Sequence, residues 1–218
     1  DRPAAWDAWN LGLKAQHPSR FRGMEIYERG PLRVCLRIYH DFLHPKAIKA
    51  YPTKDFPQSF FTQDVILYSE TPRIDFVSQV DWWQEHMMLK VAFPLNIRTE
   101  YASYEIPYAV IQRPTQLVGE DDKGKIEVPA LRWADLSDSQ YGVSVINEAK
   151  YGYDIKGNVV RLSLLRSPTW PDPMADRGKH LVRYALYPHP GDWGEAPPQK
   201  ENFRYNIPFC KSNQRMLF

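Results

Sequence analysis

Asp and Glu carboxylates are the first residues in this sequence that could do chemistry. Hydrolysis of a glycosidic bond, for example, usually needs two carboxylates, one on each side of the bond that breaks. The chain has 26 Asp and Glu residues, but their spacing does not mark any two as facing each other. His40 and His44 have the i, i+4 spacing that brings two metal ligands together on a helix. An extended pattern precedes them and Pro45 follows, so we expect two separate surface histidines. The sequence offers no cluster of converging zinc ligands.

Tryptophans form the second group of candidates, because their flat rings could stack on sugars. They are Trp6, Trp9, Trp82, Trp83, Trp133, Trp170 and Trp193. The usual role of tryptophan is packing in a core or an interface, with its N–H satisfied. Trp82 lies in phase with the apolar residues of its segment, which predicts a core position, whereas Trp83 points the other way. Trp170 stands in a loop after a strand and is the strongest candidate for lining a site.

Strands must position these residues, because period-two alternation dominates the sequence. In residues 32–39 aliphatic side chains occupy the even positions and mostly polar ones the odd positions, as a half-buried strand requires. Four further segments read as strands: 73–82, 89–93, 141–146 and 181–187. A hairpin is predicted from residues 151–155 and 159–164, because Gly157 and Asn158 between them tolerate positive φ.

Helices are expected to be rare. Only residues 133–137 read as a helical turn, and the chain has 19 prolines against 11 glycines. The segments 42–60, 115–125 and 191–202 read as loops. Many short strands separated by turns predict an all-β, antiparallel sandwich or barrel, formed as a single domain over residues 1–218.

Composition and charge exclude several classes of protein. The 43% of apolar and 14% of aromatic residues can fill a sizeable core. A formal net charge of +2 with dispersed basic residues gives no reason to expect nucleic acid or an anionic membrane as partner. Cys35 and Cys210 are too few for a disulfide framework, and no Asn-x-Ser/Thr sequon is present, which favours the cytosol. The chain starts at Asp1 without Met, so we expect a fragment or a processed product.

Ordered motifs along most of the chain carry a resemblance to a known family. They are residues 6–9, 28–33, 73–82, 89–94, 104–108, 112–115, 132–137, 141–154, 162–168, 171–178 and 188–191. The most specific is 141–154, with Asn147-Glu148-Ala149-Lys150-Tyr151-Gly152 at its centre. In this order the motifs resemble the C-terminal region of glycoside hydrolase family 38 α-mannosidases, of the cytosolic and bacterial subtype.

The resemblance implies a fold and a function. Members are retaining exo-α-mannosidases whose zinc (or cobalt) ion, aspartate nucleophile and acid/base lie in an upstream domain. The region resembled here is a β-sandwich of the galactose mutarotase type, so this chain alone should be inactive and bind no metal. Arg166, Asp172, Trp170, Trp6 and Asp7 are the residues that the resemblance places near the substrate, with Arg166 at the end of a strand.

The resemblance also implies partners: the catalytic domain of the same enzyme, α-mannoside glycans and, as a further arrangement, a homo-oligomer. Residues 116–124 depart from the polar stretch that follows the Arg-Pro-Thr of the family. The family pattern extends beyond both ends of this chain, so we expect an incomplete sandwich with an unpaired sheet edge near one terminus. A free carbohydrate-binding module and a purely structural sandwich are the alternatives.

Overall fold

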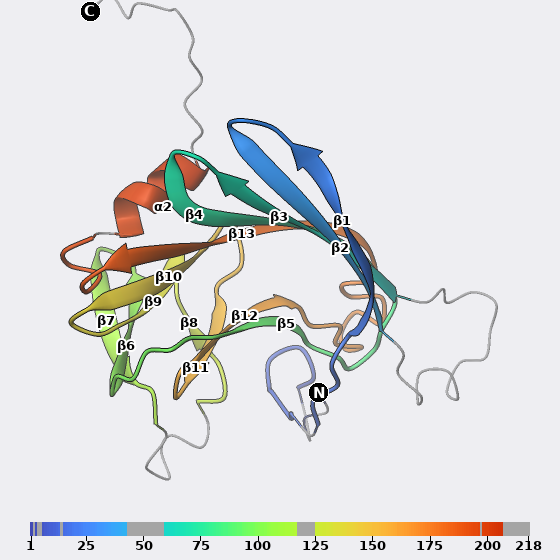
Figure 1. Ribbon diagram of the computed structural model, residues 1–218. Helices are drawn as coiled ribbons and strands as arrows, with labels where there is room; N and C mark the ends of the chain where they lie inside the picture. The colour runs from blue at the N-terminus through green and yellow to red at the C-terminus, as the bar shows by residue number, and fades with distance from the viewer. Residues whose placement is uncertain are drawn as a thin grey trace, which may run out of the picture.

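Two antiparallel sheets face each other in the computed structural model, which describes residues 1, 3, 6–13, 15–42, 59–116, 125–196 and 198–206 (Figure 1). In spatial order, the larger sheet consists of β1 (Arg20–Arg29), β2 (Arg33–Phe42), β3 (Ser59–Tyr68), β4 (Thr71–Trp82), β13 (Gly178–Pro190), β10 (Tyr141–Asn147), β9 (Trp133–Ser137), β6 (Tyr101–Ile106) and β7 (Ala109–Pro114). The smaller sheet consists of β5 (Leu89–Pro94), β12 (Val159–Leu165), β11 (Gly152–Lys156) and β8 (Val128–Pro129). The predicted all-β antiparallel sandwich is confirmed.

The strands predicted from alternation are present, most of them longer than the sequence indicated. β2, β4, β5, β10 and β13 contain all five predicted segments except Leu32. The predicted hairpin is β11 and β12, and Gly157 in its turn has a φ of 58°. Among the described strands, β1 and β7 form the two edges of the larger sheet, and the expected unpaired edge near a terminus stays a prediction.

Two local predictions are wrong. Residues 133–137 form β9 and not a helical turn; the first four of them are buried, because the smaller sheet covers one face of β9 and the cluster at α2 the other. A strand buried on both faces shows no alternation. The predicted loop 191–202 runs into the helix α2 (Pro198–Asn206), which starts with a proline, a residue favoured in the first helical turn. Glu201 of this helix pairs with Arg73 of β4 at 2.8 Å.

Other predictions fall partly outside the described residues. Most of the predicted loops 42–60 and 115–125 lies there, as do His44 and Cys210. Residues 59 and 60, at the end of the first predicted loop, belong to β3, a strand that the sequence analysis did not predict. His40 lies on β2, where its Nδ1 is 3.0 Å from the hydroxyl of Ser19.

Aromatic side chains join the two sheets. Phe76 of β4 stacks on Tyr184 of β13 with ring centroids 5.0 Å apart, and Phe93 of β5 lies 5.5 Å from Phe76. On the other side of the core, Tyr153 of β11 donates its hydroxyl to the carbonyl of Val145 at 3.1 Å. β5 therefore lies against β4 and β13, and β11 lies against β10. Trp82 is 1% exposed, so its predicted core position is confirmed.

A buried polar network lies at one end of β10. His189 Nε2 is 2.8 Å from Asp135 Oδ2, and Ser144 donates its hydroxyl to the same oxygen at 2.6 Å. Burial alone would lower the pKa of His189, but the Asp135 carboxylate more than offsets this and raises it. Gly142 lies directly against this network. A Cβ at Gly142 would overlap His189 Cε1 and lie 2.5 Å from Ser137 Cβ.

We predict that Gly142→Ala lowers the free energy of unfolding by about 1–3 kcal/mol, because the added methyl group overpacks a site with no free volume. Urea unfolding followed by tryptophan fluorescence measures the change. Gly23→Ala is the matched control, since a Cβ there meets no atom within 4 Å. Equal losses at the two positions would contradict the steric explanation.

Candidate functional site

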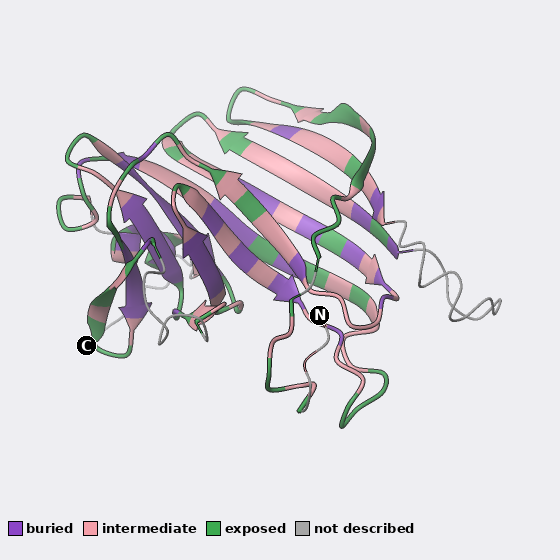
Figure 2. Cartoon of the chain, turned by 90° about the horizontal axis from the view of Figure 1, so that it is seen from below, coloured by how far each residue is buried: buried purple, intermediate pink, exposed green. Residues whose placement is uncertain are grey.

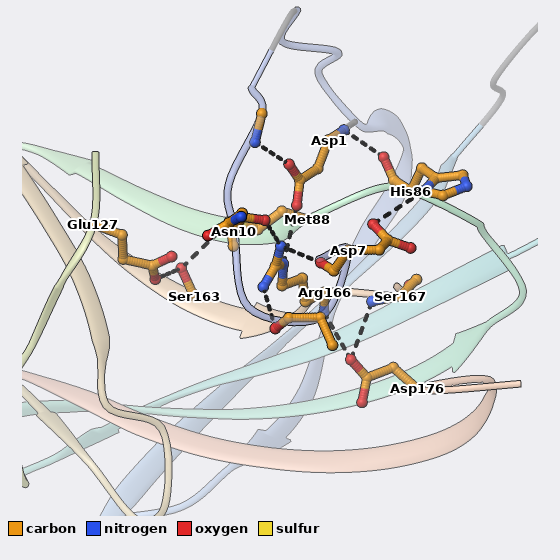
Figure 3. Close-up of polar contacts among 12 residues, drawn as sticks. Asp1, Asp7, Asn10, His86, Met88, Glu127, Ser163, Arg166, Ser167 and Asp176 are labelled. Atoms are coloured by element: carbon orange, nitrogen blue, oxygen red, sulfur yellow. Dashed lines mark hydrogen bonds and ion pairs between the residues drawn. The ribbon is translucent and has the colours of Figure 1, made fainter. Parts of the chain in front are cut away.

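Arg166 directly follows β12, at one end of the sandwich, and its guanidinium organises the segment at the start of the chain (Figure 3). Nη1 donates to the carbonyl of Ala8 at 2.7 Å, and Nη2 donates to the carbonyl of Asp7 at 2.6 Å. Nη2 also donates to the carbonyl of Asn10. Nε lies 3.0 Å from Asp1 Oδ2. The planar fork of five donors suits such a set of acceptors, so one side chain holds a whole turn in place.

The electrostatics of Arg166 follow from this partly buried position. Burial lowers the pKa of Arg166 from its ordinary value, and the carboxylate of Asp7 opposes that shift. The group stays charged at neutral pH, because an arginine starts far above it. Its charge therefore faces carbonyl oxygens and the Asp1 carboxylate, which are the acceptors that stabilise a cation in a half-buried place.

Asp176 holds the loop after β12 in a fixed shape. Its Oδ2 accepts the N–H groups of Arg166 at 3.0 Å and Ser167 at 3.1 Å. Asp172, in the same loop, accepts the N–H of Met174 at 2.8 Å and so caps its own turn. Neither aspartate pairs with the guanidinium, which is free to bind the segment at residues 7–10.

Asp7 fastens that segment to the loop from the other side. Its Oδ2 accepts the N–H of Thr169 at 2.6 Å and the Thr169 hydroxyl at 3.2 Å. Its Oδ1 lies 3.5 Å from His86 Nδ1. Partial burial alone would raise the pKa of Asp7, but the Thr169 N–H and the His86 ring lower it to a value below the ordinary one. Asp7 is therefore an ionised anchor at neutral pH.

Three tryptophans meet on the surface beside this anchor. The ring centroids of Trp6 and Trp170 are 5.7 Å apart, those of Trp9 and Trp170 are 5.5 Å apart, and the rings meet edge to face. All three side chains are exposed, Trp9 by 64%. Exposed aromatic groups gathered in one place mark a binding surface more often than packing does. We refer to Trp6, Asp7, Trp9, Arg166 and Trp170 as the Arg166 cluster.

The backbone around this cluster is unusual. Trp6, His86, Ser167 and Asp176 all have positive φ, between 52° and 59°, and Tyr108 is the one other non-glycine residue with positive φ among those described. Left-handed backbone at non-glycine residues costs about 1–3 kcal/mol each and persists where surrounding contacts impose it. Such residues concentrate at functional sites, and here four of them come from three segments of the chain.

The structure brings together four of the five residues that the sequence placed near a substrate. Trp6, Asp7, Arg166 and Trp170 lie in one cluster, whereas Asp172 is in the same loop but turns into its own backbone. Whether any of them contacts a substrate stays a prediction. The sequence missed the role of His86, for which it has no signal. Trp9 was one of the seven candidate tryptophans but was not among the five residues placed near the substrate, although the Trp-Asp-Ala-Trp spacing, which brings two rings together on one turn, could have placed it there.

The carboxylates of the site are engaged with the backbone. Asp7 and Asp176 each accept backbone N–H groups. Among the residues that the structure describes, no three His, Cys, Asp or Glu side chains gather as metal ligands. The rings offer apolar faces, and the surrounding backbone offers polar groups.

A cavity of about 340 Å³ lies elsewhere, between β7 and β11. Arg113 and Lys156 contribute charge to its lining, and Tyr104 and Tyr153 contribute rings. None of the five predicted site residues lines it. The helix α2 is too short and polar to cross a bilayer, and no other described segment forms a spanning helix.

Comparison with known proteins identifies the family. The sequence model of the glycosyl hydrolases family 38 C-terminal domain matches residues 1–174. Alpha-mannosidase 2C1 of Mus musculus is 42% identical over 217 residues, which are 95% of this chain and 19% of the mouse protein. Alpha-mannosidase G of Dictyostelium discoideum is 36% identical over 207 residues, which are 94% of this chain and 18% of that protein. The chain thus spans less than a fifth of the length of these relatives.

A solved structure agrees with the fold. The crystal structure of an alpha-mannosidase from Enterococcus faecalis V583 superposes with a TM-score of 0.74 at 17% identity, over 87% of this chain and 24% of that chain. At this identity the likeness shows the fold alone. Since the family model covers 174 of the 218 residues, the chain belongs to glycosyl hydrolases family 38 and carries its C-terminal domain.

Proposed function

We propose that this chain is the non-catalytic β-sandwich part of a retaining exo-α-mannosidase that hydrolyses terminal α-D-mannose. Residues 1–218 act as one domain of that enzyme. Family membership supports this proposal, together with relatives named alpha-mannosidase that are several times longer than this chain. We place the zinc (or cobalt) ion and the nucleophile of the intact enzyme in the rest of the protein, as the family resemblance implies.

The Arg166 cluster is the observation that carries the proposed contribution to the site. Arg166 donates to three carbonyl groups of the turn at residues 7–10, those of residues 7, 8 and 10. Asp7 binds the same turn to Thr169. This fixes Trp6 and Trp9 against Trp170 as an exposed aromatic corner. We propose that the corner forms part of the rim of the mannose pocket and that Arg166 is a positioning residue, since its donors are engaged by the chain itself.

The partners follow from this arrangement. The catalytic domain of the same enzyme lies against the Arg166 cluster, and α-mannoside glycans pass over the tryptophan rings. A cytoplasmic location is proposed on the resemblance to the cytosolic and bacterial subtype. A homo-oligomer is compatible with the open sheet edge at β1, which presents unpaired backbone groups.

A free carbohydrate-binding module is the second candidate, because three exposed tryptophans at one site are what such a module needs. The two candidates differ in what the isolated chain does. A binding module retains glycan affinity on its own. A rim that is completed by a catalytic domain has little affinity without it, because the opposite wall of the pocket is missing.

We predict that the 218-residue chain alone neither hydrolyses an aryl α-mannoside nor retains zinc. The reason is the lack of a converging ligand set among the described residues, together with the upstream position of the nucleophile that the family resemblance implies. Incubation with the chromogenic substrate and measurement of metal content after dialysis test both points. Turnover that a chelator abolishes would show that the assignment is wrong, and mannoside binding without turnover would favour the binding module.

We predict that Arg166→Ala in the complete enzyme lowers kcat/KM for an aryl α-mannoside by about 10- to 100-fold, equivalent to about 1.4–2.7 kcal/mol of transition-state stabilisation. The carbonyl groups of the turn at residues 7–10 lose the guanidinium that donates to them, so the aromatic corner loses its fixed geometry. The midpoint of thermal unfolding should fall less than for a substitution in the sandwich core, because the contacts that are lost hold the turn at residues 7–10 and not the core. Arg161→Ala on β12 is the matched control, since Arg161 contacts Asp154 and not the cluster. Equal kinetics for both variants would refute the positioning role.

A further inference from the structure

The inner face of the larger sheet becomes progressively more exposed toward β1. One row of paired residues crosses five strands: Tyr184 of β13, Phe76 of β4, Val65 of β3, Leu36 of β2 and Ile26 of β1. Paired residues point to the same face, and Phe76 contacts Phe93 of the smaller sheet, so this is the inner face. Tyr184 is 0% exposed, Phe76 8% and Ile26 54%, with the two residues between them at intermediate values.

The neighbouring row shows the same change. Met24 of β1 pairs with Ile38 of β2 and is 64% exposed. That row continues to Gln63 of β3, which is polar. In the row on the other side of Leu36, Leu67 of β3 pairs with Val34 of β2 and is 48% exposed. Figure 2, which views the molecule from below, shows intermediate and exposed residues over the strands at one edge of the larger sheet and buried residues over the other half. Single exposed apolar residues are normal, but a contiguous apolar face across three strands marks an interaction surface.

The opposite face of the same strands has the composition of a solvent-facing surface. Arg37 of β2 forms a bidentate ion pair with Asp64 of β3, at 2.6 and 2.7 Å. Tyr39 donates its hydroxyl to Glu25 at 2.6 Å. Strands that are charged on one face and aliphatic on the other are built to have the aliphatic face covered.

The smaller sheet ends where the exposure begins. β5 is its edge strand and pairs with β12. Its Phe93 reaches Phe76 of β4, and the described core cluster extends from there to Val65 of β3 and to Phe42 at the end of β2, but to no residue of β1. The other edge of β5 faces β3, β2 and β1 and has no strand partner in the described ranges. An edge of this kind presents backbone N–H and C=O groups that accept a further strand.

We propose that the inner face of β1–β3 and the free edge of β5 together form a docking surface for further β-strands of the same enzyme, which extend the smaller sheet. The proposal rests on the proposed function, because it takes the occupant from the part of the relatives, more than four-fifths of their length, that this chain does not span. Strands lie about 4.8 Å apart within a sheet, so about three added strands cover the three exposed ones. The occupant must present apolar side chains at alternate positions, because only those continue the existing core.

A second copy of this chain fits the surface less well. Two copies that stacked their apolar faces would bury Met24 and Ile26 but would leave the edge of β5 unpaired. Strands that add to β5 satisfy both features at once, the apolar face and the open backbone groups. The surface is also continuous with the core that already joins the two sheets, through Val65 and Phe76.

The test compares thiol labelling at position 24 in this chain and in the complete enzyme. Met24→Cys is introduced in a Cys210→Ser background, treated with a maleimide and quantified on the peptide by mass spectrometry. We expect fast labelling in the 218-residue chain and labelling at least about 10-fold slower in the complete enzyme. Leu32→Cys is the matched control, because Leu32 is exposed in the turn between β1 and β2 and lies outside the surface, so it should label equally fast in both proteins.

Two other results decide against the proposal. Equal labelling of position 24 in both proteins would show that the surface stays open. Slow labelling already in the 218-residue chain, with a dimer in sedimentation, would assign the surface to a second copy. Assay of the complete enzyme with an aryl α-mannoside separates the two proposals: an inactive enzyme with a protected position 24 refutes the mannosidase function and leaves the docking surface standing.

Discussion

The contact between the aromatic side chains of the two sheets is the interaction on which the rest of the structure depends. Phe76, Tyr184 and Phe93 join β4 and β13 to β5, and Tyr153 joins β11 to β10. Each sheet has one apolar face, so neither is stable without the other. The requirement to bury these faces sets the position of every strand end, and with it the place where the loop after β12 meets the start of the chain.

Arg166 connects the packed core to the candidate site. It stands one residue beyond the last buried residue of β12, so the core fixes its backbone while its side chain reaches a turn from the other end of the sequence. The hydrogen bonds and the ion pair of Arg166 thus hold the backbone of the aromatic corner, and the exposed tryptophan rings give it an apolar surface. An arrangement of this kind presents rigid rings at the surface of the domain, which is what the proposed rim of a binding pocket requires.

The sequence predicted what local pattern encodes. Strands with one apolar face, such as β2, were evident from their alternation, and the turn at Gly157 was evident from its residue types. β9 was not, because burial on both faces removes the alternation. The family resemblance supplied Trp6, Asp7, Arg166 and Trp170, yet the meeting of these residues depends on the pairing of distant segments, which spacing does not encode. His86 joins the cluster through tertiary contacts alone.

The strand order imposes a sequence of events on synthesis. β13, the last of the described strands, lies between β4 and β10, so it completes the larger sheet from the middle. Until residues 178–190 have been synthesised, β4 and β10 both lack the strand that pairs with them. Long-range pairing of this kind folds slowly and exposes edges that associate with other chains. We therefore expect the newly made chain to be most prone to association before β13 has paired with β4 and β10.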